Sequence, residues 1–128
     1  MSEPIWIRRD VIDTMHDLQL VEHGGATGIR DEGLLDSALA KPRNKHAYGE
    51  TNIHSLAASY ASGIARNHPY IDGNKRTAFL AAYVFLKING VHLVASEVAA
   101  VQMTVALASG DQDEDAFTHW LRDNSAQQ

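Results

Sequence analysis

The chain has 128 residues, a formal net charge of −5 at pH 7 and no cysteine. Its length predicts one domain, over residues 1–128, with a core that forms without cross-links. The lack of cysteine excludes disulfides, thiolate metal sites and cysteine nucleophiles. The negative charge argues against nucleic-acid binding. No stretch has the apolar character of a signal peptide or reaches the ~20 apolar residues of a membrane span, so we expect a cytoplasmic protein.

The first part of the chain predicts two helices and a loop. From about Arg9 to His23 apolar residues recur at helical spacing, and Gly24-Gly25 ends that helix because glycine tolerates left-handed backbone. Asp31 is a favourable N-cap for a second helix, which Pro42 is expected to stop. Residues 43–52 show no period, which predicts an exposed loop or a small hairpin.

Four more helices are predicted downstream. The third begins at Ile53 and ends near Asn67. The fourth, over residues 74–89, is apolar almost all round, so we expect it to be buried on all sides, with its charged start opening onto a surface cleft. Ser96 and Asp113 are expected to cap a fifth and a sixth helix. The fold class is therefore an all-α bundle of about six helices around a central buried helix.

The segment His68–Arg76 holds the densest group of chemically active residues. It reads His-Pro-Tyr-Ile-Asp-Gly-Asn-Lys-Arg and lies directly ahead of the fourth predicted helix. A helix N-terminus with unpaired N–H groups and nearby cations binds anions. A candidate base beside such a phosphate site indicates group transfer from a nucleotide.

Two residues of the segment are candidates for the chemistry itself. His68 is the one residue of the segment that exchanges a proton near neutral pH, although a histidine there can also simply cap the third helix. Asp72 is a hard oxygen ligand, and Mg²⁺ needs only one or two carboxylates beside substrate phosphates. Asp72 can equally be a plain helix cap.

The following residues are candidates for binding phosphate. Gly73, Asn74, Lys75 and Arg76 would present successive N–H groups that wrap an anion. Asn74 can bond either the phosphate or its own loop. Lys75 offers a point charge and Arg76 a planar fork for two phosphate oxygens.

This segment resembles the signature of the Fic/Doc family, His-Pro-Phe-x-Asp/Glu-Gly-Asn-Gly/Lys-Arg, with Tyr70 where phenylalanine is usual. Lys75 makes it closer to the Doc (death-on-curing) branch than to the adenylylating Fic branch. That branch usually reads Gly-Asn-Gly-Arg-x-x-Arg, whose second arginine is replaced here by Phe79. Residues 28–40 are similar to the upstream block of Doc-type toxins, and the resemblance runs from about Val11 to Gly90.

The resemblance implies a role for each site residue. It implies a Fic/Doc-like fold with a flap loop at Lys45–Thr51, ahead of the third helix, that docks the target segment. His68 would be the general base and Asp72 the Mg²⁺ ligand. The residues that would bind the phosphates of ATP are Gly73, Asn74, Lys75 and Arg76.

Three functions are compatible with this pattern. The first is a Doc-like toxin kinase that moves the γ-phosphate of ATP to a hydroxyl of a translation factor such as elongation factor Tu and arrests translation; Lys75 favours it. The second is an adenylyltransferase that moves AMP to a protein hydroxyl. The third is an inactive interaction module on the same fold, which the intact His68, Asp72, Asn74 and Arg76 argue against.

The sequence contains no internal inhibitor of the kind that many Fic relatives carry. Their inhibitory helix reads Ser/Thr-x-x-x-Glu-Gly/Asn, whereas Glu32-Gly33 here has Gly28 at the first position. The resemblance therefore implies a cognate, Phd-like antitoxin acting in trans, whose partly disordered segment folds over the cleft as a helix.

The remaining histidines are weaker candidates. His46, with Tyr48, lies in the predicted loop and would border the cleft only if that loop reaches it. The others lack metal-ligand spacing with one another and are predicted to be structural or solvated: His16, His23, His54, His92 and His119.

Overall fold

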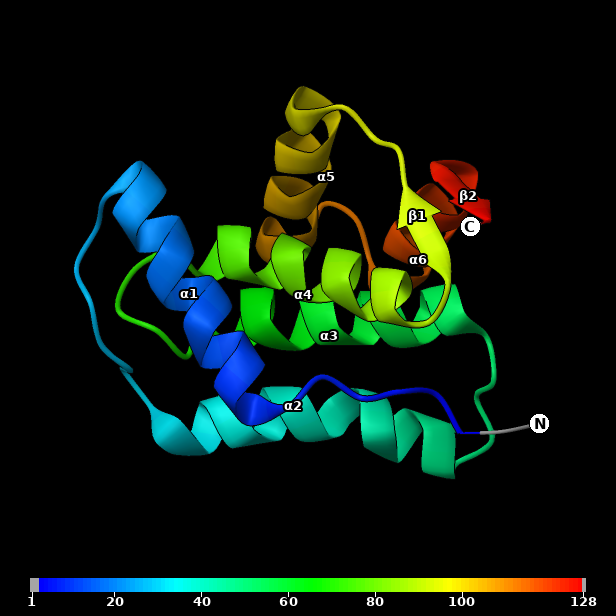
Figure 1. Ribbon diagram of the computed structural model, residues 1–128, viewed down its shortest axis with the longest axis horizontal. Helices are drawn as coiled ribbons and strands as arrows, with labels where there is room; N and C mark the ends of the chain where they lie inside the picture. The colour runs from blue at the N-terminus through cyan, green and yellow to red at the C-terminus, as the bar shows by residue number, and fades with distance from the viewer. Residues whose placement is uncertain (1–2, 128) are drawn as a thin grey trace.

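The computed structural model describes residues 3–127, and this part of the chain contains six helices and two short strands (Figure 1). Strands β1 (Val91–Leu93) and β2 (Ser125–Gln127) pair antiparallel, with Val91 opposite Gln127. The predicted all-α bundle of about six helices is confirmed. The helices are α1 (Arg9–His23), α2 (Glu32–Ala47), α3 (Ile53–Asn67), α4 (Asn74–Ile88), α5 (Glu97–Ser109) and α6 (Glu114–Asp123).

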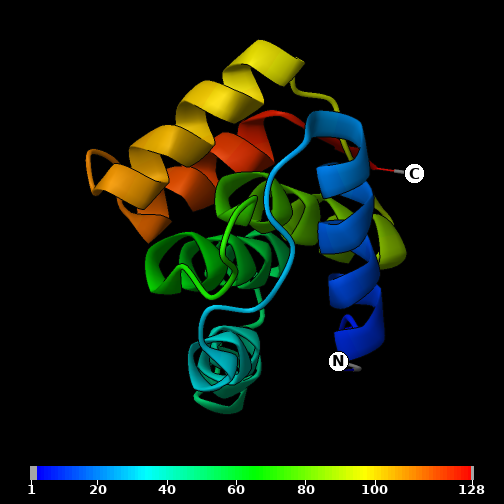
Figure 2. The same ribbon diagram turned by 90° about the vertical axis from the view of Figure 1, so that its left-hand side faces the viewer.

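The centre of the bundle is α3, in which every residue from Ser55 to Ala65 is buried. It packs against α2, α4, α5 and α6, and the end-on view places it between α2 and α4 (Figure 2). Alanine, serine and glycine predominate in this stretch and allow close approach. A Cβ on Gly63 would lie only 3.0 Å from the carbonyl oxygen of Ala38 in α2.

The expectation that residues 74–89 form the helix buried on all sides is wrong. One face of α4 is fully buried, at Ala78, Ala81 and Phe85. Another part of its surface is only half-buried, at Phe79, Leu80, Tyr83 and Val84. The apolar character of α4 is therefore divided between the core and a groove, whereas small residues make α3 the more deeply buried helix.

α2 continues through Pro42 to Ala47, so the predicted stop at Pro42 and the predicted loop over residues 43–47 are wrong. A proline inside a helix removes a backbone hydrogen bond and costs about 3 kcal/mol. Lys41 and Lys45 both bond the carboxylate of Glu114 at the start of α6. These ion pairs and the burial of Pro42 offset the cost, and a local sequence pattern does not reveal such tertiary contacts.

The predicted helix caps are confirmed. Each cap side chain accepts a hydrogen bond from the backbone N–H three residues later, which satisfies one of the unpaired donors at a helix start. The pairs are Asp31 with Leu34, Ser96 with Ala99, and Asp113 with Ala116.

The loop 68–73, which joins α3 to α4, lies at one end of the bundle beside the α1–α2 connection, on the left of Figure 1. The α2–α3 connection, the first described residues and β2 lie at the opposite end. Because α3 has 15 residues, roughly 22 Å separate the two ends of the bundle.

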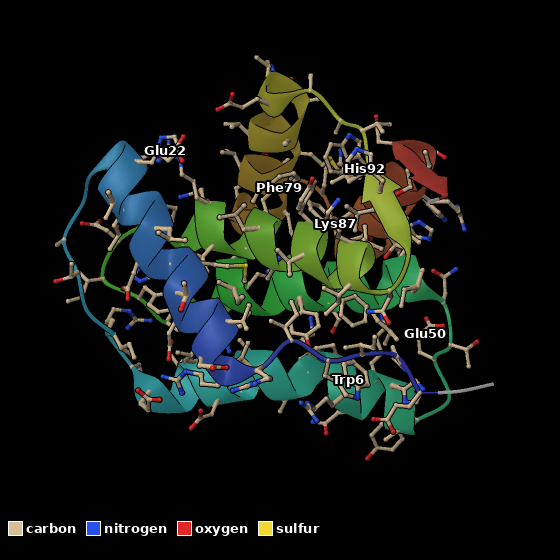
Figure 3. All side chains as sticks on the ribbon, viewed as in Figure 1. Trp6, Glu22, Glu50, Phe79, Lys87 and His92 are labelled. Carbon is tan, nitrogen blue, oxygen red and sulfur yellow. The ribbon has the colours of Figure 1, made fainter. Side chains whose placement is uncertain are left out.

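The expected flap at Lys45–Thr51 is therefore wrong in its position. Lys45 to Ala47 belong to α2, and Glu50 lies at the far end of the bundle from the loop 68–73 (Figure 3). At that distance, residues 45–51 do not border His68. The connection that borders the loop 68–73 is residues 24–31.

Within residues 3–127, no helix has both the length and the apolar character that crossing a membrane requires.

Candidate functional site

The loop 68–73 is held in place by the connection 24–31 through strand-like pairing. Ile29 and Tyr70 form an isolated antiparallel bridge, and the Ile71 N–H donates to the Gly28 carbonyl oxygen at 3.1 Å. Figure 2 faces this end of the molecule and shows both segments in front of the bundle. Gly28 permits the contact, because a Cβ there would lie 3.1 Å from Cδ1 of Ile71.

Arg30 fixes the end of α3 next to this bridge. Its Nε donates to the His68 carbonyl oxygen at 2.8 Å, and a terminal guanidinium nitrogen donates to the Asn67 carbonyl oxygen at 2.9 Å. Its backbone N–H donates to the Pro69 carbonyl oxygen at 2.7 Å. The last carbonyls of a helix lack hydrogen-bond partners within the helix, and the two charge-assisted bonds from the guanidinium supply such partners at the end of α3.

His68 caps α3 in the left-handed region, with φ 53° and ψ 53°. It is the one non-glycine residue among residues 3–127 with a positive φ, a conformation that costs about 1–2 kcal/mol. Its backbone N–H donates to the Ile64 carbonyl oxygen at 3.1 Å. The side chain is exposed, and no group in the described part of the chain bonds its imidazole. The ring is therefore accessible for proton transfer.

Asp72 is exposed, and one of its carboxylate oxygens is already held. Oδ2 accepts a hydrogen bond from the Ala26 N–H at 2.7 Å, while no described group bonds Oδ1. Gly25 lets the connection approach, since a Cβ there would lie 3.2 Å from Cβ of Asp72. Within residues 3–127, no group of three or more His, Cys, Asp or Glu is arranged so that it could hold a metal ion. A single free carboxylate oxygen suits Mg²⁺, which keeps its waters and takes further oxygens from phosphates.

The start of α4 is an uncapped helix N-terminus. Its N-cap is Gly73, with φ 80° and no side chain to accept from the first N–H groups. No described group accepts from the backbone N–H groups of Asn74, Lys75 and Arg76. These donors, together with the helix dipole, favour an anion at this position.

The side chain of Asn74 serves its own loop. Its Oδ1 accepts from the Tyr70 N–H and its Nδ2 donates to the Tyr70 carbonyl oxygen, both at 2.9 Å. The residue is 3% exposed. The sequence allowed the Asn74 amide two partners, the phosphate or its own loop, and in the structure it bonds the loop. The backbone N–H of Asn74 is therefore the part that faces the anion position.

Lys75 and Arg76 are exposed, and neither forms an ion pair with any described side chain. Cations at a helix N-terminus oppose the dipole, so this arrangement is favourable only when an anion is present. Both residues line one end of a groove of about 480 Å³ between α1, α4 and α5. The groove is otherwise largely apolar, and Phe79 lies in it on the side of α4 that faces α5 (Figure 3).

Sequence reasoning missed two residues of α1 that contact the loop. His16, predicted to be structural or solvated, is buried, and its Nε2 lies 2.7 Å from the Asp72 carbonyl oxygen. Gln19 packs over Gly73, where a Cβ would overlap its amide. Their spacing from Ile12 places both on the buried face of α1, and polar residues on such a face are the signal that was available.

His46 and Tyr48 do not border the site. His46 meets Trp6 edge-on, with ring centroids 5.6 Å apart, and Tyr48 is 94% exposed at the far end of the bundle.

The chain is similar to known proteins over the region that contains this site. Residues 6–86 match the Fic/DOC family. A protein named Toxin Doc from Mycolicibacterium smegmatis is 47% identical over 78 residues, a match that spans 59% of each chain. A protein named Protein kinase doc from Escherichia phage P1 is 33% identical over 109 residues, which span 84% of this chain and 86% of the phage protein.

Proposed function

Because the chain belongs to the Fic/DOC family, we propose that it is a toxin kinase of the Doc type, which moves the γ-phosphate of ATP to a hydroxyl group of a protein. The observation that carries this proposal is the uncapped start of α4, where Lys75 and Arg76 have no ion-pair partner among the described side chains. The names of the two relatives, Toxin Doc and Protein kinase doc, support it.

In the proposed reaction His68 acts as the general base. Its unbonded imidazole takes the proton from the acceptor hydroxyl, a role typically worth 10²–10⁴-fold in rate. The hydroxyl oxygen forms a bond to the γ-phosphorus, the bond from that phosphorus to the β–γ bridging oxygen breaks, and ADP leaves with the electron pair.

The phosphate chain of ATP would lie at the start of α4. The N–H groups from Gly73 onward, the Lys75 ammonium and the Arg76 guanidinium would hold it. Asp72 would hold Mg²⁺ through its unbonded oxygen, and the ion supplies charge neutralisation for the phosphates.

Two residues support transfer of phosphate rather than AMP. Lys75 adds a cation where the adenylylating branch has glycine. Phe79, where that branch has its second arginine, packs against Tyr83 and Trp120, with ring centroids 6.3 and 6.5 Å away. α4 therefore offers no second arginine for a nucleotide bound with its α-phosphate facing His68.

The acceptor that we propose is a translation factor such as elongation factor Tu, so the protein would act in the cytoplasm. An acceptor segment would reach His68 past the connection 24–31, every residue of which has an exposed surface. Mass spectrometry of the labelled protein in a lysate tests this identity, and a labelled protein unrelated to translation would contradict it.

Double labelling of ATP tests the reaction. The purified chain is incubated with a cell lysate and ATP labelled at the α- or the γ-phosphate. We expect only the γ-label to appear on protein, and His68→Ala to reduce this labelling about 100-fold or more. The exposed His119 on α6 provides the control, because His119→Ala should leave labelling unchanged. Transfer of the α-label would identify an adenylyltransferase, and no labelling would identify an inactive interaction module.

The partner that we propose is a small Phd-like antitoxin acting in trans. The groove beside Lys75 and Arg76 supports this, because α5 leaves Val98, Val101 and Val105 at 67, 52 and 45% exposure. Val101 and Val105 line the groove, so an amphipathic helix laid in it would cover these two valines and meet the two cations with acidic residues. We expect the chain alone to arrest growth on expression and an adjacent small open reading frame to restore it. Normal growth at high expression would contradict the toxin assignment.

A further inference from the structure

We propose that His16 is a positioning residue that fixes Asp72 and the peptide unit following it, an inference that rests on the proposed function. His16 lies in α1, far from the motif in sequence, and is 2% exposed. Its Nε2 lies 2.7 Å from the Asp72 carbonyl oxygen. A carbonyl oxygen only accepts, so Nε2 carries the hydrogen and donates it.

The imidazole is held in one orientation by Tyr70. The two rings stack with centroids 3.6 Å apart and planes 10° apart. Tyr70 is itself immobilised, because its backbone N–H and carbonyl both bond Asn74 and its hydroxyl lies 3.5 Å from Oδ1 of Asp13. The donor atom of His16 therefore has a fixed position and direction relative to the loop.

His16 and Ala26 together hold Asp72 at two points. His16 binds its carbonyl oxygen, and the Ala26 N–H binds Oδ2 of its carboxylate. The two contacts come from different segments, α1 and the connection 24–31. With both in place, the remaining carboxylate oxygen has little freedom to turn away from the start of α4.

The bond to His16 also orients the first N–H of the anion site. The Asp72 carbonyl and the Gly73 N–H belong to one peptide unit, which is planar and trans. Holding that carbonyl toward α1 directs the Gly73 N–H to the opposite side, away from α1. The hydrogen bond from His16 thus fixes the position of the Asp72 carboxylate and the direction of the Gly73 N–H.

A purely structural role does not require a histidine here. The buried residues of α1 are Ile12, His16, Gln19 and Leu20, and His16 is the one whose side chain bonds the loop 68–73. An aromatic hydrocarbon side chain would fill the space and keep the stacking with Tyr70. What it would lose is the donor.

Two substitutions separate the donor from the volume. His16→Phe keeps a ring against Tyr70 and removes the N–H, whereas His16→Gln restores an amide N–H at similar reach. The exposed His119 supplies the control, His119→Phe. Each variant is measured for thermal melting, for γ-phosphate transfer against Mg²⁺ concentration, and for amide hydrogen exchange of residues 68–76 without nucleotide.

We expect His16→Phe to melt cooperatively, to need about 10-fold more Mg²⁺ for half-maximal transfer, and to exchange faster at residues 72–76, since residues that orient a metal ligand typically contribute 10–100-fold. His16→Gln should recover most of both losses, and His119→Phe should match the wild type.

Unchanged exchange and unchanged Mg²⁺ dependence in His16→Phe would overturn the proposal. So would equal losses in both His16 variants together with a lower melting temperature, because the imidazole would then serve only packing. A wild-type chain that transfers no phosphate would contradict the proposed kinase function instead. The exchange measurement would still decide the role of His16.

Discussion

At the scale of single residues, Gly73 shows how two constraints meet at one position. Its φ of 80° disfavours any side chain, and the Gln19 amide occupies the place where a Cβ would lie. Both polar atoms of that amide are buried without a hydrogen-bond partner in the described structure. The two constraints are separable, because one belongs to the backbone and the other to a neighbour.

A double-mutant cycle measures them. Gly73→Ala should lower the free energy of unfolding by the backbone cost of about 1–2 kcal/mol plus a steric term. Gly90 is the matched control: its φ is 87° and nothing lies within 4 Å of its missing Cβ, so Gly90→Ala reports the backbone cost alone. Adding Gln19→Ala to Gly73→Ala should reduce its cost to the Gly90 level in urea unfolding. A cost that stays equal in the presence and absence of Gln19 would show that the amide moves aside freely.

The grouping of the contiguous part of the candidate site follows from the sequence alone. His68 to Arg76 are neighbours in the chain, so any helix starting near residue 74 brings them together. It did not predict His16, Ala26 and Arg30, because their contacts depend on how α1 and the connection 24–31 pack against the loop. Asn74 illustrates the same limit: its residue type permits two partners, and only the closed loop reveals which it bonds.

At the scale of the helices, features set by local signals could be predicted from the sequence, whereas features set by tertiary contacts could not. Helix starts were predictable because a cap acts within three residues, as at Ser96 and Asp113. The extension of α2 past Pro42 and the exposed side of α4 were not, since both depend on distant partners. α5 also has a surface that a distant partner would have to cover, because its stripe of exposed valines has no partner within the described structure.

Substitution in that stripe tests its proposed role in binding the proposed antitoxin. Val101→Arg places a charged side chain at the groove, and we expect it to weaken the antitoxin at least 10-fold in calorimetry while toxicity is retained. Stability should change by no more than about 0.5 kcal/mol, as for other exposed positions. Val21→Arg, on an 85% exposed position of α1 that does not line the groove, should leave the affinity unchanged. Equal affinities for both variants would place the antitoxin elsewhere.

At the scale of the whole molecule, pH acts through two groups whose pKa values the fold lowers. Burial raises the pKa of Glu114, but its hydrogen bonds and charge interactions with Lys41 and Lys45 outweigh burial and hold the pKa below the ordinary 4.5. Burial, with the nearby Arg122 charge, lowers the pKa of His54 from 6.5. In both cases the unfolded chain binds the proton more readily, so acid destabilises the fold.

The melting temperature should therefore fall in two stages on acidification. The contribution of His54 is complete above pH 6.5 and is lost below it, and that of Glu114 is complete above pH 4.5 and is lost below it. Calorimetry between pH 8 and pH 3.5 measures both stages. Glu114→Gln should remove the lower stage, whereas Asp115→Asn, on an exposed neighbour, should preserve it. A lower stage that persists in Glu114→Gln would assign it to other carboxyl groups.

The different placement of the two ends of the described chain has a practical consequence for joining this protein to its proposed inhibitor as one polypeptide. Leu93 lines the groove and pairs with Ser125 in β2, so the C-terminal strand lies beside the groove. From the N-terminal end, an inhibitory helix would have to pass about the length of α3 before it reached Lys75 and Arg76. At about 3.3 Å for each extended residue, roughly 22 Å requires a spacer of at least about seven residues. A fusion at the C-terminal end would need a shorter spacer, so the end chosen for the fusion would decide whether a short spacer lets the proposed inhibitor cover the site.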